Sequence, residues 1–259
     1  MNRTALFMRK CKYKLLNFIF NAGVVYRKLG SYSPKYHNLK KYQNVYKGKR
    51  CFILCTGPSL NINDLEMLEH EYTFGMNSIC LVFDKTKWRP TFFGIQDDLV
   101  YKKVAKTLHK ENKTKVLYGS TVKLLYKKKK NWIGFPLNIN YHLYERLWEK
   151  RFFAKFSHNA YFEVYDGYSI TYSLIQIAIY MGFKEIYLLG ADCSFLGTKQ
   201  HFIEHGHYDN DIGSAAERNI TSYAEAKNYA DQHNIKIFNA TRGGKLEIFP
   251  RVSLEQILR

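Results

Sequence analysis

The sequence has little of what marks several protein classes. Among 259 residues there are only 16 Gly, 5 Pro and 5 Cys. This excludes a flexible low-complexity chain, a collagen-like fibre and a disulfide-stapled miniprotein. No pair of Cys-x-x-Cys units occurs, which argues against a structural zinc site built from thiolates. With 46% hydrophobic and 24% charged residues, the chain has the composition of an ordinary globular protein with a sizeable core.

Acidic residues are missing from the N-terminal part of the chain. Residues 1–50 contain thirteen Lys or Arg and no Asp or Glu, and residues 101–130 contain eleven Lys and one acid, Glu111. The formal net charge is +18. A positive field of this size attracts anionic partners, such as nucleic acid, acidic lipid headgroups or a phosphorylated substrate.

The apolar run at residues 15–25 is shorter than the roughly 20 residues that a bilayer-spanning helix needs. Two interpretations stay open: a helix packed on the domain, or an interfacial helix that inserts Phe18 and Ile19 among anionic lipid headgroups. We therefore predict a basic N-terminal extension over residues 1–49 and a domain over residues 50–259. The thiols are expected to be reduced, in a cytoplasmic protein peripheral to the inner face of the membrane.

From residue 50 onward the pattern alternates between short apolar runs and amphipathic segments. It predicts strands at 50–55, 72–76, 91–95, 115–118, 185–189 and 235–238, and helices at 65–70, 99–109, 169–181 and 215–232. Residues 119–160 are less regular. The alternation predicts an α/β fold: a Rossmann-like, mostly parallel sheet with helices on both faces.

Polar residues follow the predicted strands, where ligands bind in parallel sheets of this type. The candidate nucleotide-binding residues at these ends, with one from the start of the helix at 169–181, are Thr56, Gly57, Pro58, Ser59, Asn77, Ser78, Gln96, Asp97, Ser169 and Asp192. Because the carboxyl ends of parallel strands lie along one edge, we expect a single site.

The side chains at these ends suit a nucleotide. Gly57 leaves backbone N–H groups open to a phosphate, and Ser59 adds a hydroxyl. The amides of Asn77 and Gln96 suit a nucleobase or ribose, and Asp192 suits ribose hydroxyls. A plain turn or a helix cap is the structural alternative for each. The loop at 56–60 matches neither G-x-G-x-x-G nor G-x-x-x-x-G-K-[ST], which disfavours dinucleotide binding of the NAD type and P-loop NTPase activity.

Residues 201–211 form the densest polar cluster of the sequence. Either one histidine of this cluster is a general base that the others orient, or His201, His205 or His207 binds a metal together with Asp209 or Asp211. A surface loop without a chemical role is the structural alternative. No metal or other cofactor is expected unless the substrate carries a diphosphate, in which case a divalent ion at Asp209 and Asp211 is predicted.

Taken in order, these motifs resemble a known family. The set is Gly57-Pro58-Ser59-Leu60, Asn77, the stretch from Gly182 to Asp192, and the His-x-x-x-His unit at 201–205. It resembles the bacterial lipooligosaccharide sialyltransferases of glycosyltransferase family 42. It is also similar to the wider Rossmann-like group that holds motility-associated flagellin glycosyltransferases and hydroxymethylpterin pyrophosphokinases. The resemblance covers roughly residues 50–240 and implies a GT-A-like variant of the fold.

The resemblance implies a metal-independent, inverting transfer of a sialic-acid-like sugar from a CMP-activated donor to a surface glycan or glycolipid. It assigns the catalytic base to His205, and nucleotide contacts to Thr56, Gly57, Ser59 and Asn77. A second asparagine of the family falls near Gln96 or Asp97. The family also uses two tyrosines to support the leaving phosphate; one position is Ser194 here, so Tyr208 or a lysine of 127–130 is the expected replacement.

Two other functions remain as alternatives. A pterin pyrophosphokinase would use ATP and Mg²⁺. A non-catalytic nucleic-acid-binding protein would use the positive charge and the many aromatic residues, 21 Tyr and 18 Phe. The partners expected for the leading hypothesis are a nucleotide-sugar donor, a glycan acceptor, an anionic membrane surface and a second copy of the chain.

Overall fold

The computed structural model describes residues 3–149, 151–194, 202–203 and 212–259. The strands are β1 (Arg50–Leu54), β2 (Thr73–Met76), β3 (Phe92–Ile95), β4 (Lys115–Gly119), β5 (Trp132–Phe135), β6 (Leu137–Asn138), β7 (Val164–Tyr165), β8 (Glu185–Leu189) and β9 (Lys236–Asn239). The helices are α1 (Arg3–Lys28), α2 (His37–Lys40), α3 (Ile62–Met67), η1 (Asn77–Val82), α4 (Asp98–Lys110), α5 (Asn140–Glu149), α6 (Ile170–Tyr180), α7 (Ile212–Gln232) and α8 (Leu254–Ile257).

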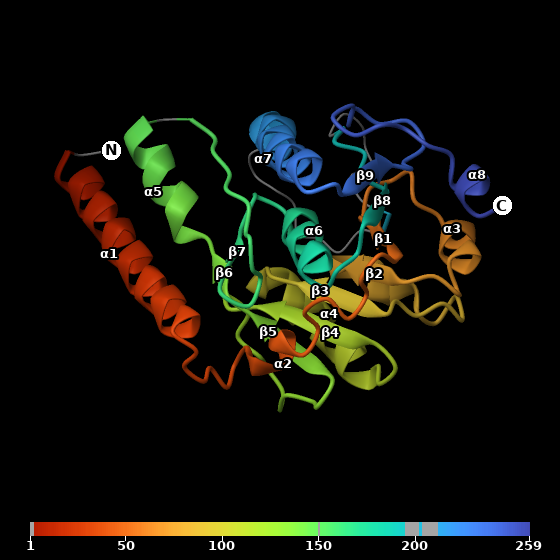
Figure 1. Cartoon of the computed structure of the whole chain (residues 1–259), viewed down its shortest axis with the longest axis horizontal. Coiled ribbons are helices and arrows are strands. Elements are labelled where there is room, and N and C mark those ends of the chain that lie inside the picture. The colour runs from red at the N-terminus through yellow and green to blue at the C-terminus, as the bar shows by residue number, and fades with distance from the viewer. Residues whose placement is uncertain (1–2, 150, 195–201, 204–211) are drawn as a thin grey trace.

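Seven strands form one sheet in the order β5-β4-β3-β2-β1-β8-β9, in which every neighbouring pair is parallel (Figure 1). From β1 the chain builds the sheet outward to β5, then returns to the other side of β1 with β8. The strand order therefore reverses between β1 and β8, which makes this the topological switch point of the sheet. The predicted α/β, Rossmann-like fold is confirmed.

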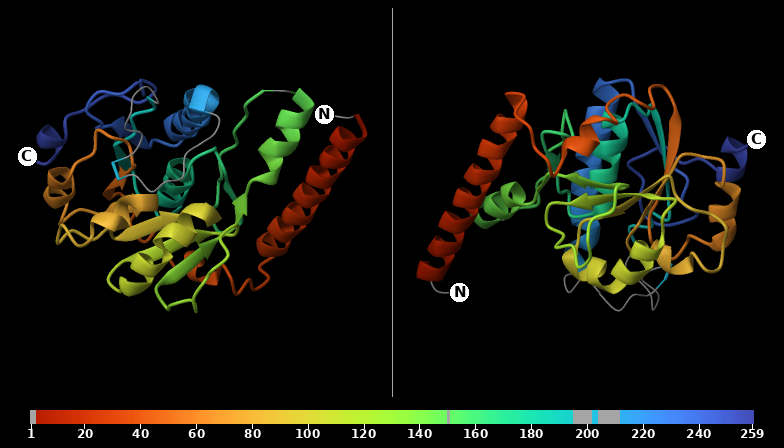
Figure 2. Two further views of the ribbon diagram at one scale, coloured as in Figure 1. Left: turned by 180° about the vertical axis from the view of Figure 1, so that it is seen from behind. Right: turned by 90° about the horizontal axis from the view of Figure 1, so that it is seen from below.

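Side chains of β1 alternate between two cores. Cys51 and Ile53 pack on the face covered by α6 and α7, and Phe52 and Leu54 pack on the face covered by α3 and α4. This alternation is the period of two that a strand buried on both faces requires. The views in Figures 1 and 2 show the helices on both sides of the sheet, as predicted.

α6 runs through the middle of one face and is buried along nearly its whole length. It ends before Gly182, whose φ of +99° suits a residue without a side chain, as the sequence predicted. All six predicted strands are present. β5 and α5, in contrast, lie inside residues 119–160, which were predicted to be irregular.

α1 is a helix of 26 residues, more than twice the length of its apolar run. It packs along α5, and the two helices project side by side from one end of the sheet in every view (Figures 1 and 2). Arg27 fastens α1 to the domain, because its Nε and Nη2 donate to the Phe162 carbonyl at 2.9 and 2.6 Å. No helix in the described part of the chain has the length and hydropathy to cross a membrane.

The segment after α1 joins the sheet domain. Leu39 is fully buried in the core that contains α6. The rings of Tyr46 and Phe183 stack with centroids 4.8 Å apart, and Tyr42 meets Phe92 edge to face. Residues 37–49 therefore cover part of the sheet, whereas α1 stands apart from it.

Candidate functional site

Gly57 and Asp192 meet at the switch point, one after β1 and the other after β8. The Gly57 N–H donates to the Gly190 carbonyl at 2.9 Å, and the Ser59 hydroxyl donates to Asp192 Oδ2 at 2.8 Å. A Cβ on Gly57 would lie 1.9 Å from Asp192 Oδ2 and 2.4 Å from the Gly190 carbonyl oxygen. The bare α-carbon of Gly57 therefore makes room for Asp192, a role that differs from the predicted approach to a phosphate.

A second loop, at residues 241–245, holds Asp192 from the other side. The Lys245 N–H donates to the Asp192 carbonyl at 2.7 Å. Gly244 has a φ of +76°, and a Cβ there would lie 2.6 Å from the same carbonyl oxygen. Arg242 forms an ion pair with the buried carboxylate of Asp64. Sequence reasoning missed this loop, although two glycines flanked by Arg and Lys directly after a strand were a usable signal.

The N-terminus of α6 points at the ends of β1 and β2. Its N-cap Ser169 accepts a hydrogen bond from the Tyr172 N–H. The Thr171 hydroxyl lies 3.4 Å from Cys55 Sγ and 3.5 Å from Met76 Sδ, at the ends of those two strands. The first-turn N–H groups and the partial positive charge of α6 therefore face the same edge as Gly57.

Two amide side chains stand at the ends of the neighbouring strands β2 and β3. Asn77 has a φ of +49°, and its Oδ1 is buried. Gln96 Nε2 donates to Asp166 Oδ1 at 2.9 Å, which leaves Gln96 Oε1 as a buried acceptor. Neither oxygen has a hydrogen-bond partner among the residues that the structure describes, and the same holds for the buried Ser78 hydroxyl.

Asp97 caps a helix. Its Oδ1 accepts from the N–H groups of Leu99 and Val100 at 2.7 and 3.2 Å, at the start of α4. The nucleotide contact predicted for Asp97 stays a prediction, and so do those of the other candidates.

Asp166 is a site residue that sequence reasoning missed. Besides the bond from Gln96, its Oδ2 lies 3.7 Å from the His142 Nε2. Burial raises the pKa of Asp166 to about 7, although Gln96, the Tyr168 N–H and the charge of Arg218 act in the opposite direction. The signal was a carboxylate directly before Gly167 and the start of α6, but β7, only two residues long, gave no detectable strand pattern.

This raised pKa makes a testable prediction about stability. Between about pH 4, where an unfolded Asp releases its proton, and pH 7, the folded chain binds more protons than the unfolded chain. Stability therefore falls as the pH rises through this window, by up to about 4 kcal/mol. Asp166→Asn keeps an acceptor for Gln96 and should remove this part of the slope in urea unfolding at pH 4 to 7. His142→Gln isolates the contribution of the adjacent imidazole, and equal slopes in wild type and Asp166→Asn would contradict the assignment.

The histidine segment lies mostly outside the described residues. This applies to His201, His205, Tyr208, Asp209 and Asp211, so their predicted roles stay predictions. Phe202 is described: it is buried, and its N–H donates to the Thr56 carbonyl at 2.7 Å, directly before Gly57. Among the residues that the structure describes, no group of three or more His, Cys, Asp or Glu side chains is placed to hold a metal ion.

Two other features of the structure lie away from the switch point. Lys129 Nζ donates to Asn112 Oδ1 at 2.8 Å and to the carbonyl of His109, in the last turn of α4. Because α4 runs back from the end of β3, this places Lys129 at the amino ends of the strands. The support of a leaving phosphate that the sequence suggested for a lysine of 127–130 stays a prediction.

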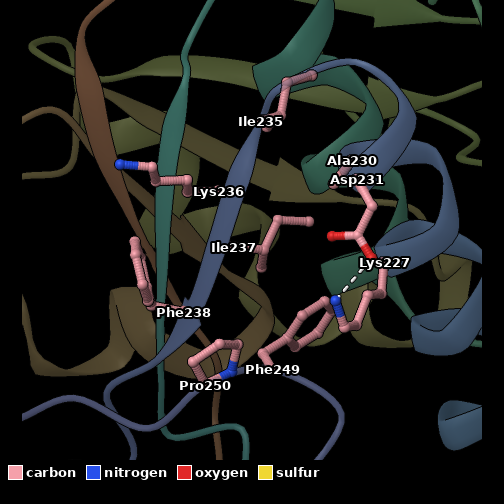
Figure 3. Close-up of a pocket in the computed structure, with 9 residues that line it drawn as sticks. All are labelled: Lys227, Ala230, Asp231, Ile235, Lys236, Ile237, Phe238, Phe249 and Pro250. Carbon is pink, nitrogen blue, oxygen red and sulfur yellow. Dashed lines mark hydrogen bonds and ion pairs between the residues drawn. The ribbon is translucent and has the colours of Figure 1, made fainter.

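A pocket beside the edge strand β9 is the second of these features (Figure 3). Ile235, Ile237 and Phe249 form its apolar walls, and the 2.7 Å ion pair of Lys227 with Asp231 lies at its rim. The lining runs along β9 from Ile235 to Phe238, so the pocket lies beside this edge strand and not at the switch point between β1 and β8. We do not count it as part of the candidate site.

Residues 17–198 match the model of a protein family described as 6-hydroxymethylpterin diphosphokinase MptE-like. The chain belongs to the MptE-like family. The matched region runs from within α1 to beyond Asp192, and so includes the switch point. No curated protein is significantly similar in sequence to this MptE-like chain.

Two solved structures share the fold of the MptE-like chain. The MAf glycosyltransferase from Magnetospirillum magneticum AMB-1 superposes with a TM-score of 0.52 at 16% identity, over 85% of this chain and 38% of that one. The sialyltransferase CstII from Campylobacter jejuni, in complex with the substrate analogue cytidine-5'-monophosphate, superposes with a TM-score of 0.50 at 14% identity, over 80% and 86%. The chain thus spans well under half of the MAf protein. The predicted resemblance to this Rossmann-like group is confirmed at the level of the fold, and membership of the sialyltransferase family stays a prediction.

Proposed function

We propose that this protein is a glycosyltransferase that takes a sugar from a CMP-activated donor and transfers it, with inversion and without a metal, to a glycan or glycolipid acceptor. The observation that carries the proposal is the pair of buried amide oxygens of Asn77 and Gln96 at the ends of β2 and β3. A buried polar atom without a partner costs about 1–3 kcal/mol, so such a pair indicates a ligand that supplies N–H or O–H groups.

The chemistry of these acceptors supports a cytidine nucleotide. Gln96 Nε2 donates a hydrogen bond to Asp166, so the other polar atom of this amide, Oε1, is an acceptor. The exocyclic amine of cytosine and the hydroxyls of ribose are donors that match such acceptors. The N-terminus of α6, which faces the same edge, would accept the single phosphate of CMP without a metal. A structure of similar fold was solved with cytidine-5'-monophosphate, which supports a cytidine nucleotide as the ligand to test.

In the proposed mechanism, His205 removes the proton of the acceptor hydroxyl as the bond between the sugar and the phosphate breaks. Attack by the acceptor oxygen on the anomeric carbon then forms the new glycosidic bond, and CMP departs with the electron pair of the broken bond. Tyr208 would donate a hydrogen bond to the departing phosphate. Phe202 is tied to the Thr56 carbonyl, which supports assigning the neighbouring histidine segment to this reaction.

A thermal-shift screen tests the nucleotide assignment. CMP should raise the free energy of unfolding by about 2.7 kcal/mol at 100 times its dissociation constant. CDP, UDP, GDP and ATP should raise it less. Asn77→Gly removes the unpartnered acceptor and keeps a residue that tolerates the positive φ, so it should weaken CMP binding by about 10-fold. Asn44→Gly is the matched control, because Asn44 is exposed with a φ of +57° and should leave CMP binding unchanged. Equal CMP binding in all three proteins would contradict the assignment.

The family match favours a second candidate function, a diphosphokinase that acts on a pterin. This enzyme needs ATP and a divalent ion, and so ATP with Mg²⁺ should stabilise the protein while CMP does not. Asp209 and Asp211 would then be the residues to test as metal ligands, as they would for a nucleoside diphosphate sugar. Salt-sensitive binding to arbitrary DNA, with no stabilisation by any nucleotide, would instead indicate a non-catalytic nucleic-acid-binding protein.

A further inference from the structure

α1 has two apolar faces, of which only one is used inside the molecule. The packed face carries Tyr13, Phe20 and Val24, at intervals of seven and four residues, and α1 packs against α5. The opposite face is exposed although it is apolar: Phe7 is 67% exposed, Phe18 70% and Ile19 56%. Nothing in the described part of the chain covers this second face.

The exposed side chains form one continuous band. With about 100° of rotation per residue, six of them fall within roughly 120° of the helix circumference. They define what we call the outer stripe: Phe7, Leu15, Phe18, Ile19, Val25 and Tyr26. A stripe of this width on the solvent side of a helix is typical of a surface that binds a partner.

Positive charge borders the outer stripe on both sides. The same rotation places Lys12 next to Ile19 on one side and Lys14 next to Phe7 on the other, and both lysines are exposed. α1 carries seven Lys or Arg and no acid, and residues 1–50 contain no acid either. The partner must therefore have an apolar interior directly beneath a negatively charged surface layer.

We propose that the outer stripe docks the protein on an anionic lipid bilayer, with α1 lying in the plane of the headgroups. The aromatic and aliphatic side chains of the stripe would insert among the acyl chains, and the lysines on either side would pair with lipid phosphates. Arg27 and the packing on α5 hold α1 to the domain, so insertion of the stripe carries the whole molecule to the membrane. The inference does not depend on which reaction the strand-end site performs.

The same observations disfavour other occupants. Two copies of α1 packed stripe to stripe would bring the bordering lysines Lys12 and Lys14 of both copies together, with no acid on either helix. Nucleic acid would satisfy the lysines, but its phosphate backbone would leave the apolar stripe in water. An anionic bilayer satisfies both parts of the surface.

Co-sedimentation of the full chain with vesicles tests the proposal. We expect binding to vesicles of phosphatidylglycerol and phosphatidylcholine, weaker binding to pure phosphatidylcholine, and loss of affinity as NaCl is raised. The double variant Phe18→Ser, Ile19→Ser should bind at least about 10-fold less tightly. Lys12→Gln with Lys14→Gln should reduce the preference for anionic vesicles by about 25-fold, since each basic residue near the surface contributes about a factor of five.

Ile220→Ser, an exposed apolar position on α7, is the matched control and should bind as the wild type does. Circular dichroism should show all variants folded, because the side chains of the outer stripe are exposed. Absence of vesicle binding by the wild type, or equal binding by the stripe variant, would overturn the proposal. A concentration-dependent dimer in sedimentation equilibrium that the stripe variant loses would also overturn it, and would assign the surface to a second copy.

Discussion

Replacement of His205 by alanine is expected to abolish both the slow hydrolysis of a CMP-sugar and the transfer of its sugar to an acceptor. Loss of a general base lowers kcat by about 10²–10⁴-fold. CMP binding should change less than about twofold, because the base would contact the acceptor hydroxyl and not the nucleotide. Release of CMP, measured in steady state with and without an acceptor glycan, is the readout.

Two further histidine variants make this experiment selective. His201→Ala should reduce activity less than His205→Ala, since His201 is assigned an orienting role. His70→Ala changes an exposed histidine after α3 and should leave kcat unchanged. Full activity of His205→Ala would refute the assignment of the base. Loss of CMP binding together with activity would show instead that His205 acts in binding the donor.

The strand ends could be predicted from the sequence because their signals are local. Runs such as residues 51–55 are apolar throughout, as parallel strands buried on both faces are, and each is followed by a polar residue or a glycine. Parallel topology then requires these ends to lie along one edge. This reasoning predicts that the segments of Gly57 and Asp192 lie together, and the Ser59–Asp192 hydrogen bond agrees with it.

The features that were missed depend on contacts distant in sequence. β5 follows four consecutive lysines, and its four residues become a strand only through pairing with β4. Asp166 acquires its raised pKa from burial beside Gln96, 70 positions earlier in the chain. α1 extends far beyond its apolar run because its packed face is mixed in polarity and is recognised only next to α5.

Gly57→Ala is expected to destabilise the fold and to weaken CMP binding at the same position. The new methyl group would lie 1.9 Å from Asp192 Oδ2, 2.8 Å from Asp192 Cγ and 2.4 Å from the Gly190 carbonyl oxygen. The Asp192 side chain can rotate away from the new methyl group. The Gly190 carbonyl belongs to the backbone next to β8 and cannot rotate away, so the loops after β1 and β8 must separate. Overpacking of this kind costs about 2–3 kcal/mol, which lowers the melting temperature by roughly 5–10 °C in a chain of this size.

A double-mutant cycle separates the two parts of this clash. Asp192→Ala removes the carboxylate but leaves the Gly190 carbonyl in place, so Gly57→Ala should cost less in the Asp192→Ala background than in the wild type, yet still destabilise. Gly23→Ala is the matched glycine control: its Cβ would lie 3.3 Å from Arg27 Nη1, a contact that a shift of a few tenths of an ångström relieves. Alanine is favoured over glycine within a helix by about 1 kcal/mol, so stability should change little. Wild-type stability and CMP affinity in Gly57→Ala would mean that the loops after β1 and β8 separate at no cost. The switch point would then not be the rigid base of the nucleotide site, because a site that positions a phosphate must resist that movement.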